Sequence, residues 1–508
     1  MTSISAVLSI ASNGLGVISH ELSLVSQNVA NAGTPNYAVE TSTRTSVSAD
    51  GVGLGVRDGA ATRQIDLALQ AAGRSQSGTV SNLQTRQNAL QAIDAAQGTP
   101  SQGNDLSSLL GKLQNAFSTL QTAPDNQAQQ SAVISNAANL AGGINNLSQS
   151  YGAQRQAAQD DLVASVSTLN TALGTIGSLT SRIIALHAAG GSTADLENER
   201  DTAIQTVSQL VGVKVLNQAN GGVVLTTNDG MGLPINGNAA FTAPGGTIGA
   251  GAFYPGGGIQ GITLAGVDVT NQLSGGQIGA DLTLRDTTFP TFQGELDEFA
   301  QNLASRFDAQ GLTLFTDPTG AVPPSGGTPA QTSYVGFAGT IQVNPQVVAN
   351  ISLVRDGTGA VAGSPTGASA FTPNPAGGPA GFTGLISRVL DFAFGDQVQS
   401  GVPQPASQTT GLGPAGNLSA PYQAPTTLGK LATTLVAAQS QESSDVTGRL
   451  ATEESVQANI NSRMQAVSGV NMDTEMATMI QLQNAYGANA KIVSVAQNLF
   501  DQILQMVH

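Results

Sequence analysis

The sequence predicts an α+β protein with long terminal coiled-coil helices and a helical bundle, and with β domains inserted in the middle of the chain. Three observations lead to this fold class. Apolar residues repeat at alternating steps of four and three at both ends of the 508-residue chain, which is the pattern of a coiled-coil seam. The stretch 64–210 keeps a helical period almost throughout. At Gly212 the period changes to two, which is typical of strands.

Charge and composition exclude several classes of partner and site. The formal net charge is -15, and only 10% of the residues are charged. Four lysines without a basic cluster give no electrostatic footprint for a phosphate backbone, so neither nucleic acid nor a membrane is an expected partner. Cysteine is absent, which excludes disulfides and thiolate metal sites. No run of 18 apolar residues occurs and no Lys or Arg precedes Arg44, so neither a membrane span nor a standard signal peptide is expected.

The N-terminal helix has an entirely apolar seam. Gly14 and Gly16 lie in its middle, and each costs about 1 kcal/mol relative to alanine, so the helix needs a partner to be stable. Gly33 and Pro35 end it. We expect this N-terminal seam to be an assembly surface formed by Ile4, Leu8, Ala11, Leu15, Ile18, Leu22, Val25 and Val29.

The last 41 residues, 468–508, carry a second seam in the same steps of four and three. Two such seams at opposite ends of the chain predict that the termini come together, and because each helix depends on a partner, both are expected to be largely disordered in the isolated protein. The C-terminal seam comprises Met472, Met476, Met479, Tyr486, Val493, Phe500, Leu504 and Val507.

Between the ends, the chain alternates helical and extended segments. Glycine-separated valines predict short strands or an extended arm up to Arg63, and four further apolar seams then follow as far as Leu210, the first capped by Asn104 or Asp105. Asn220-Gly221 predicts a type I′ hairpin turn. A helix is expected over 283–307, a Gly- and Pro-rich β region with long loops over 310–425, and helix from Thr427 to the end.

These elements predict a nested order of three domains, in which the chain leads out from the termini and returns. The terminal coiled-coil domain with its extended arm takes residues 1–62 and 445–508. The helical bundle domain takes 63–212, 281–310 and 426–444, and the β-rich outer region takes 213–280 and 311–425.

The sequence contains no catalytic constellation and implies no cofactor or metal. His20, His187 and His508 are scattered, without partners at ligand spacing. The acidic residues 195–201 are expected to favour the dipole at a helix start, and Glu295, Asp297 and Glu298 are expected on a solvated helix face. We therefore expect no enzyme activity.

The segment after the first helix resembles the N-terminal signature of bacterial flagellar rod, hook and hook-associated proteins. Asn36 stands where that motif usually has glycine, which asparagine can replace because it tolerates a left-handed backbone. Residues 468–475 and 481–486 resemble the end of the hook-associated protein 1 family (FlgK family), and 196–201, 210–215 and 279–285 are similar to it too. The motif residues are Ser26, Asn28, Ala30, Asn31, Thr34, Pro35 and Tyr37.

The resemblance implies a non-enzymatic structural protein of the flagellum that joins hook to filament as a helically packed adaptor. It implies export by the flagellar type III apparatus without a cleaved signal peptide, and an extracellular location at the hook–filament junction. The implied partners are copies of itself, the hook protein, a second hook-associated junction protein, the export apparatus and an export chaperone that binds the C-terminal seam. Apolar seams exposed at both ends need such masking before assembly.

Two alternatives remain open from the sequence. Another flagellar axial protein, such as the hook protein, shares the terminal signature, but the long bundle over 64–210 favours the junction family. A secreted acidic hydrolase with coiled-coil ends would need a pair of carboxylates facing each other in a pocket.

Overall fold

A computed structural model describes residues 2–34, 36–49, 52–99 and 101–507. It is mostly helical, as the sequence predicts. The π-helical turn Leu284–Thr288 joins two helices end to end, and a second one, Val389–Ala393, extends the short helix Gly384–Arg388. The helices are α1 (Thr2–Asn31), α2 (Leu67–Gln97), α3 (Leu106–Thr122), α4 (Gln127–Ala188), α5 (Ala194–Leu210), α6 (Gly276–Thr283), α7 (Phe289–Ala309), α8 (Pro345–Ala349), α9 (Leu353–Asp356), α10 (Gly384–Arg388), α11 (Leu428–Ser468) and α12 (Met472–Val507).

The strands are short and form small antiparallel sheets of two or three strands in the described part of the chain. They are β1 (Glu40–Thr41), β2 (Arg44–Ala49), β3 (Val52–Asp58), β4 (Thr62–Arg63), β5 (Val213–Asn217), β6 (Val223–Thr227), β7 (Phe241–Thr242), β8 (Thr263–Leu264), β9 (Val267–Asp268), β10 (Phe315–Thr316), β11 (Gln342–Val343), β12 (Gln397–Gln399), β13 (Val402–Pro403), β14 (Thr410–Leu412) and β15 (Leu418–Ser419).

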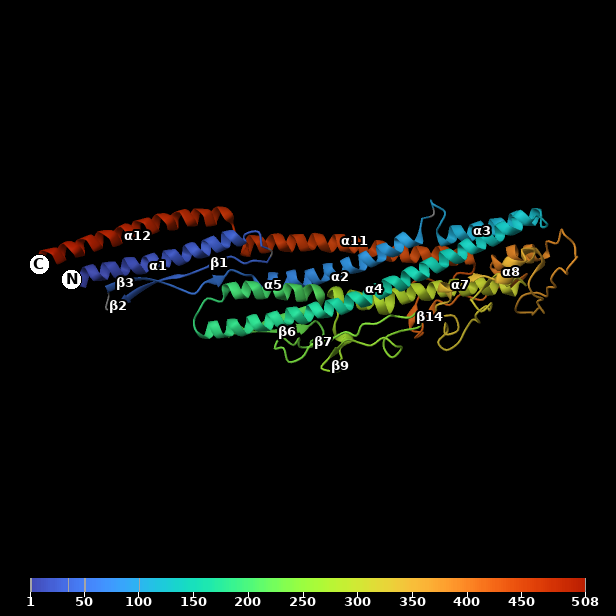
Figure 1. The fold of residues 1–508 in the computed structure, drawn as a ribbon, viewed down its shortest axis with the longest axis horizontal. Helices are drawn as coiled ribbons and strands as arrows, with labels where there is room; N and C mark the ends of the chain where they lie inside the picture. The colour runs from blue at the N-terminus through green and yellow to red at the C-terminus, as the bar shows by residue number, and fades with distance from the viewer. Residues whose placement is uncertain (1, 35, 50–51, 100, 508) are drawn as a thin grey trace.

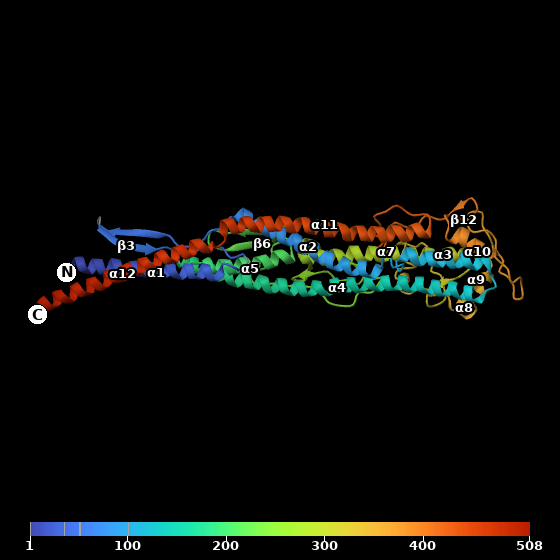
Figure 2. The same cartoon turned by 90° about the horizontal axis from the view of Figure 1, so that it is seen from above.

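The molecule is a long rod with both chain ends at one tip (Figure 1). There α1 lies beside α12, with the hairpin β2–β3 along α1, while α2, α4, α7 and α11 run along the rest of the rod (Figure 2). The β segments from β5 onward lie on the flank and at the far end of the bundle. The predicted fold class is therefore confirmed, whereas the three-domain division stays a prediction.

Local sequence sets the helix ends in the bundle. Asp105 caps α3 by accepting hydrogen bonds from the backbone N–H groups of Ser107 and Ser108, as predicted, and Asp66 and Asn126 cap α2 and α4 in the same way. The second and third predicted bundle seams lie on one continuous 62-residue helix, α4. No strong breaker separates them, because the only interruption is Gly152, and a single glycine costs only about 1 kcal/mol in a helix that packs along its length.

The apolar interior forms two large clusters along α4. One joins its first half to α2, α3, α7 and α11, and the other joins its second half to α5 and the β5–β6 hairpin. By length and composition alone α4 could cross a membrane, but most of its buried apolar side chains belong to these two clusters, as in the central helix of a bundle.

The predicted hairpin exists as β5–β6, but its turn differs from the prediction. The backbone N–H of Gln218 donates to the carbonyl of Gly222 at 2.8 Å, which leaves a three-residue loop. Gly221 has a φ of 82°, whereas Asn220 is not among the positive-φ residues. A type I′ turn needs positive φ at both central residues, so the loop is of the three-residue kind with glycine at its left-handed position.

The Gly- and Pro-rich segment packs against α7 through buried carboxylates. The carboxylate of Asp297 accepts hydrogen bonds from the backbone N–H groups of Gly336 and Ala338, both at 2.8 Å. Glu298 accepts the hydroxyl of Tyr334 at 2.6 Å and the backbone N–H of Gln408 at 2.7 Å. The expectation of a solvated acidic face on α7 was therefore wrong, because loops lacking a ladder of their own use these buried carboxylates as backbone acceptors.

Candidate assembly site at the paired termini

The two terminal helices pair antiparallel within one chain. Gly14 lies beside Asn489, Ile18 and Val25 share a small apolar cluster with Leu482, and Asn28 meets Glu475. This descending order of partners fixes the antiparallel direction. The cluster has only three buried members, far fewer than either bundle cluster, so the terminal pair is held by much less apolar burial than the bundle.

The described residues of the N-terminal seam face the interior of this pair. Ala11, Ile18 and Val25 are buried. Alternating with them along the helix are four half-buried members, Leu8, Leu15, Leu22 and Val29. The side chain of Ile4 lies outside the described part of the chain.

The C-terminal seam is turned largely away from α1. Met472, Met476, Tyr486 and Phe500 are each more than 40% exposed, and Met479 and Val493 are half-buried. The side chains of Leu504 and Val507 lie outside the described part. Of the predicted positions, Met479 packs against the α1 cluster. The other contacts from α12 come from Leu482 and Ala485, and Ala496 is also buried; none of these three belongs to the predicted seam.

Asn28 of the signature motif is the polar centre of the site. Its amide is 1% exposed, and it pairs with the backbone of Glu40 in both directions: its Nδ2 donates to the Glu40 carbonyl at 2.9 Å, and its Oδ1 accepts the Glu40 N–H at 3.0 Å. The hydroxyl of Tyr37 donates to the same Oδ1 at 3.1 Å, and Nδ2 also reaches Glu475 at 3.3 Å. One side chain thus joins α1, the arm and α12.

The other motif residues are placed more locally. Asn31 donates to the carbonyl of Gln27 one turn back at 3.1 Å and accepts from the hydroxyl of Thr34 at 3.3 Å. Asn36 has a φ of 64°, the left-handed backbone that its replacement of glycine requires. Pro35 lies outside the described residues. Ser26 and Ala30 are exposed.

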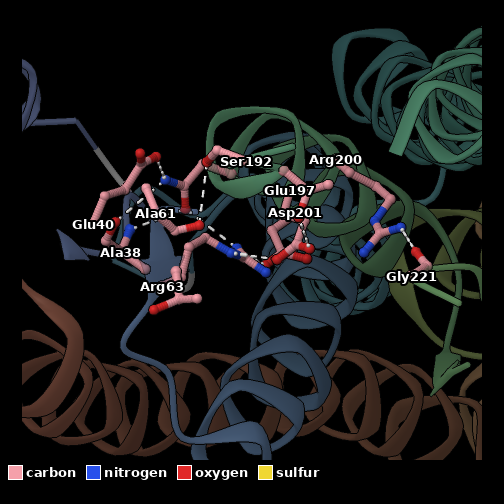
Figure 3. Close-up of polar contacts among 12 residues, drawn as sticks. Ala38, Glu40, Ala61, Arg63, Ser192, Glu197, Arg200, Asp201 and Gly221 are labelled. Atoms are coloured by element: carbon pink, nitrogen blue, oxygen red, sulfur yellow. Dashed lines mark hydrogen bonds and ion pairs between the residues drawn. The ribbon is translucent and has the colours of Figure 1, made fainter. Parts of the chain in front are cut away.

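An ionic and amide network ties the arm to the bundle, and sequence reasoning did not identify it (Figure 3). Arg63 donates to Glu197 at 2.9 Å and to Asp201 at 2.6 Å, and Asp201 also accepts from Arg74 at 2.8 Å. Asn198 pairs with the backbone of Ala38 in both directions at 3.2 Å. The only sequence signal was the acidic start of α5, and nothing in the sequence pointed to partners about 130 positions away.

Glu40 is buried where these two networks meet. Its carboxylate accepts from Asn198 at 2.9 Å, while its backbone pairs with Asn28. Burial raises the pKa of Glu40 to about 7, and the neighbouring carboxylate of Asp195 adds to the shift. The arm also reaches the hinge between α11 and α12, where the N–H of Val39 donates to the carbonyl of Ser468 at 2.8 Å. The arm therefore fixes how the terminal pair sits on the bundle.

The described residues offer no site for chemistry at a metal centre. Across the ranges given above, no group of three or more His, Asp or Glu side chains is placed to hold a metal ion. His20 lies next to Asp58, which makes it a neighbour of a single carboxylate and no part of a ligand set. His508 lies outside the described residues.

Comparison with known proteins gives consistent matches. Residues 90–321 match the family model of the flagellar hook-associated protein FlgK helical domain, and residues 462–506 match that of the flagellar basal body rod FlgEFG protein C-terminal segment. The chain is 22% identical to flagellar hook-associated protein 1 of Escherichia coli (strain K12), over 99% of this chain and 100% of that protein. It is 24% identical to flagellar hook-associated protein 1 of Bacillus subtilis (strain 168), over 99% and 98%. The structure of the flagellar hook junction protein FlgK from Burkholderia pseudomallei aligns with a TM-score of 0.40 at 24% identity, covering 50% of this chain and 46% of that one.

Proposed function

We propose that this chain, which belongs to the family of flagellar hook-associated protein 1, joins hook to filament as a helically packed adaptor. As a member of this family it is a structural component of the extracellular flagellum and not an enzyme. The observation that carries the proposed role is the likeness to hook-associated protein 1 over almost the whole chain in two distant bacteria.

The geometry of the terminal pair supports packing between copies. Burying a large apolar side chain is worth about 1.5 to 3 kcal/mol, and α12 leaves Met472, Met476, Tyr486 and Phe500 partly in solvent. These side chains form an exposed apolar face on a helix that is attached to the rest of the chain by little apolar burial. Such a face marks an interaction surface. This face differs from the α1 face, so contacts between the two are heterologous. Such contacts need not close on themselves, which suits an open helical array.

The remaining partners follow from the family as part of the same proposal. Export runs through the flagellar type III apparatus without a cleaved signal peptide, and an export chaperone covers the C-terminal seam until secretion. At the junction the chain contacts copies of itself, the hook protein and a second hook-associated junction protein. The low charge of the terminal helices suits such lateral contacts, since few charges must lose water.

Immunogold labelling of isolated flagella tests the role directly. Antibody against this chain should label a band confined to the distal end of the hook. Label along the whole hook would instead assign the chain to the hook protein and overturn the proposal. A deletion strain should show no band and should shed filament subunits into the medium.

A further inference from the structure

A groove of about 900 Å³ lies between α1 and the β2–β3 hairpin, on a side of α1 that α12 does not cover. Its lining mixes apolar and polar side chains: Ile10 and Val17 come from the helix beside Ser9, Ser12 and Asn13, and Val47, Leu54 and Val56 come from the hairpin. All of the apolar ones except Val17 are at least 36% exposed. The groove carries few charges, with His20, Arg57 and Asp58 at its edge.

An apolar stripe on α12 is also exposed, and its side chains are apolar like those that the hairpin contributes to the groove. Ile492, Val495 and Leu499 follow one another at steps of three and four, so they share one side of the helix. They are 47%, 51% and 48% exposed. None of the three belongs to the heptad seam that the sequence indicated, which occupies neighbouring positions of the same helix.

The stripe and the groove do not meet within one chain. Val17 lines the groove while Ile18 faces α12, and one step along a helix turns the side chain by about 100°. Figure 1 shows α12 along one side of α1 and the hairpin along the other. Both features lie at the same height along the rod, because Gly14 lies beside Asn489 on one side and Ile10 beside Gly55 on the other.

From this placement we infer that the groove between α1 and the β2–β3 hairpin receives the Ile492–Val495–Leu499 stripe of a neighbouring copy of this chain. Two copies side by side and parallel, without a large shift along the rod, bring the two surfaces together. The contact is heterologous, so each copy offers a groove to one neighbour and a stripe to the next. The inference rests on the proposed assembly of copies and names the surfaces that carry it.

Disulfide trapping in assembled flagella tests this contact, and the native absence of cysteine leaves no background. A strain lacking the native chain would express Leu54→Cys together with Val495→Cys, and its isolated flagella would be mildly oxidised. We expect a ladder of cross-linked dimers and higher multimers of this chain. The matched control pairs Leu216→Cys, an apolar site on β5 that is more exposed than Leu54, with Val495→Cys and should stay monomeric.

Each other result overturns the inference. If the cysteine introduced by Leu54→Cys reacts fully with maleimide in intact flagella, nothing covers the groove. If it cross-links to a different flagellar protein, that protein occupies the groove. Pairing Leu54→Cys with Leu499→Cys guards against poor geometry at one site. Failure of the junction role is a separate readout, since immunogold label outside the junction overturns the role while the copy-to-copy ladder still reports the contact.

Discussion

Asn28 pairs with the backbone of Glu40 as a second strand would, donating to its carbonyl at 2.9 Å and accepting its N–H at 3.0 Å. A side-chain amide offers one donor and one acceptor side by side, so it satisfies both backbone groups. This contact holds the arm against α1 and places the family motif at the centre of the terminal unit.

Replacing Asn28 by alanine should loosen the terminal unit. The change leaves the buried N–H and carbonyl of Glu40 without partners, and each unsatisfied group costs about 1 to 3 kcal/mol. We expect faster amide hydrogen exchange at residues 38–41 and loss of filament attachment. Asn31→Ala is the matched control: it removes only local bonds within the helix end, so a small fall in melting temperature with normal junctions is expected. Equal effects of the two changes would contradict the central role of Asn28.

A charge in the N-terminal seam should block assembly without blocking export. Ile18 is buried against α12, and an unpaired buried charge costs several kcal/mol. With Ile18→Asp or Leu15→Asp we expect hooks to form, the variant to be secreted, and filament subunits to accumulate in the medium, as measured by immunoblotting. Ser23→Asp is the control, because it places the same charge on the exposed side of α1, and cells that carry it should swim normally. If cells with Ile18→Asp grow filaments of wild-type length, the N-terminal seam is not an assembly surface.

The bundle should lose stability as pH rises from about 4.5 to 7. Burial raises the pKa of Glu295 from 4.5 to about 7, and its Oε1 has no hydrogen-bond partner among the described residues. The folded state therefore holds the proton of Glu295 more tightly than the unfolded state, so the contribution of this group to stability is fully present below pH 4.5 and is lost as the pH rises to about 7. The loss attributable to Glu295 is at most about 3 kcal/mol.

Chemical denaturation at several pH values measures how the free energy of unfolding changes with pH, and the slope of that dependence is the quantity compared. Glu295→Gln keeps the shape of the side chain and cannot ionise, so it should remove the pH dependence of the unfolding free energy that is due to Glu295. The pH dependence due to Asp297 and Glu40 should remain. Glu454→Gln, at an exposed site of α11, serves as the control and should leave the slope unchanged. A slope that survives Glu295→Gln in full would show that this carboxyl titrates normally.

Limited proteolysis of the monomer should strip both ends and leave one core. The terminal cluster buries Ile18, Val25 and Leu482 alone, whereas the bundle buries two large apolar clusters. We expect loss of roughly the first and last 40 to 60 residues and a resistant fragment that begins before Leu83 and ends after Leu450. Mass spectrometry of the fragments checks this, and added export chaperone should protect only the C-terminal end. Resistant termini in a proven monomer would mean that the pair is stable without neighbours.

Local pattern in the sequence determined the long helices and that the two ends meet, because helical periodicity and capping act over a few residues. It did not find α8, α9 and α10 in the Gly- and Pro-rich segment, where a β region was expected. The family resemblance located Asn28 and the left-handed backbone of Asn36. Tertiary structure alone decided which face of α12 meets α1. This helix carries two overlapping apolar repeats, and only its contact with Ile18 and Val25 selects Leu482 over Met476 and Tyr486 for burial. The same holds for Asp297, whose carboxylate was expected in solvent from the sequence. It is buried because the backbone N–H groups of Gly336 and Ala338 need a hydrogen-bond acceptor from outside their own loop. Such choices depend on partners that lie from about 40 to more than 400 residues away, about which a local pattern carries no information.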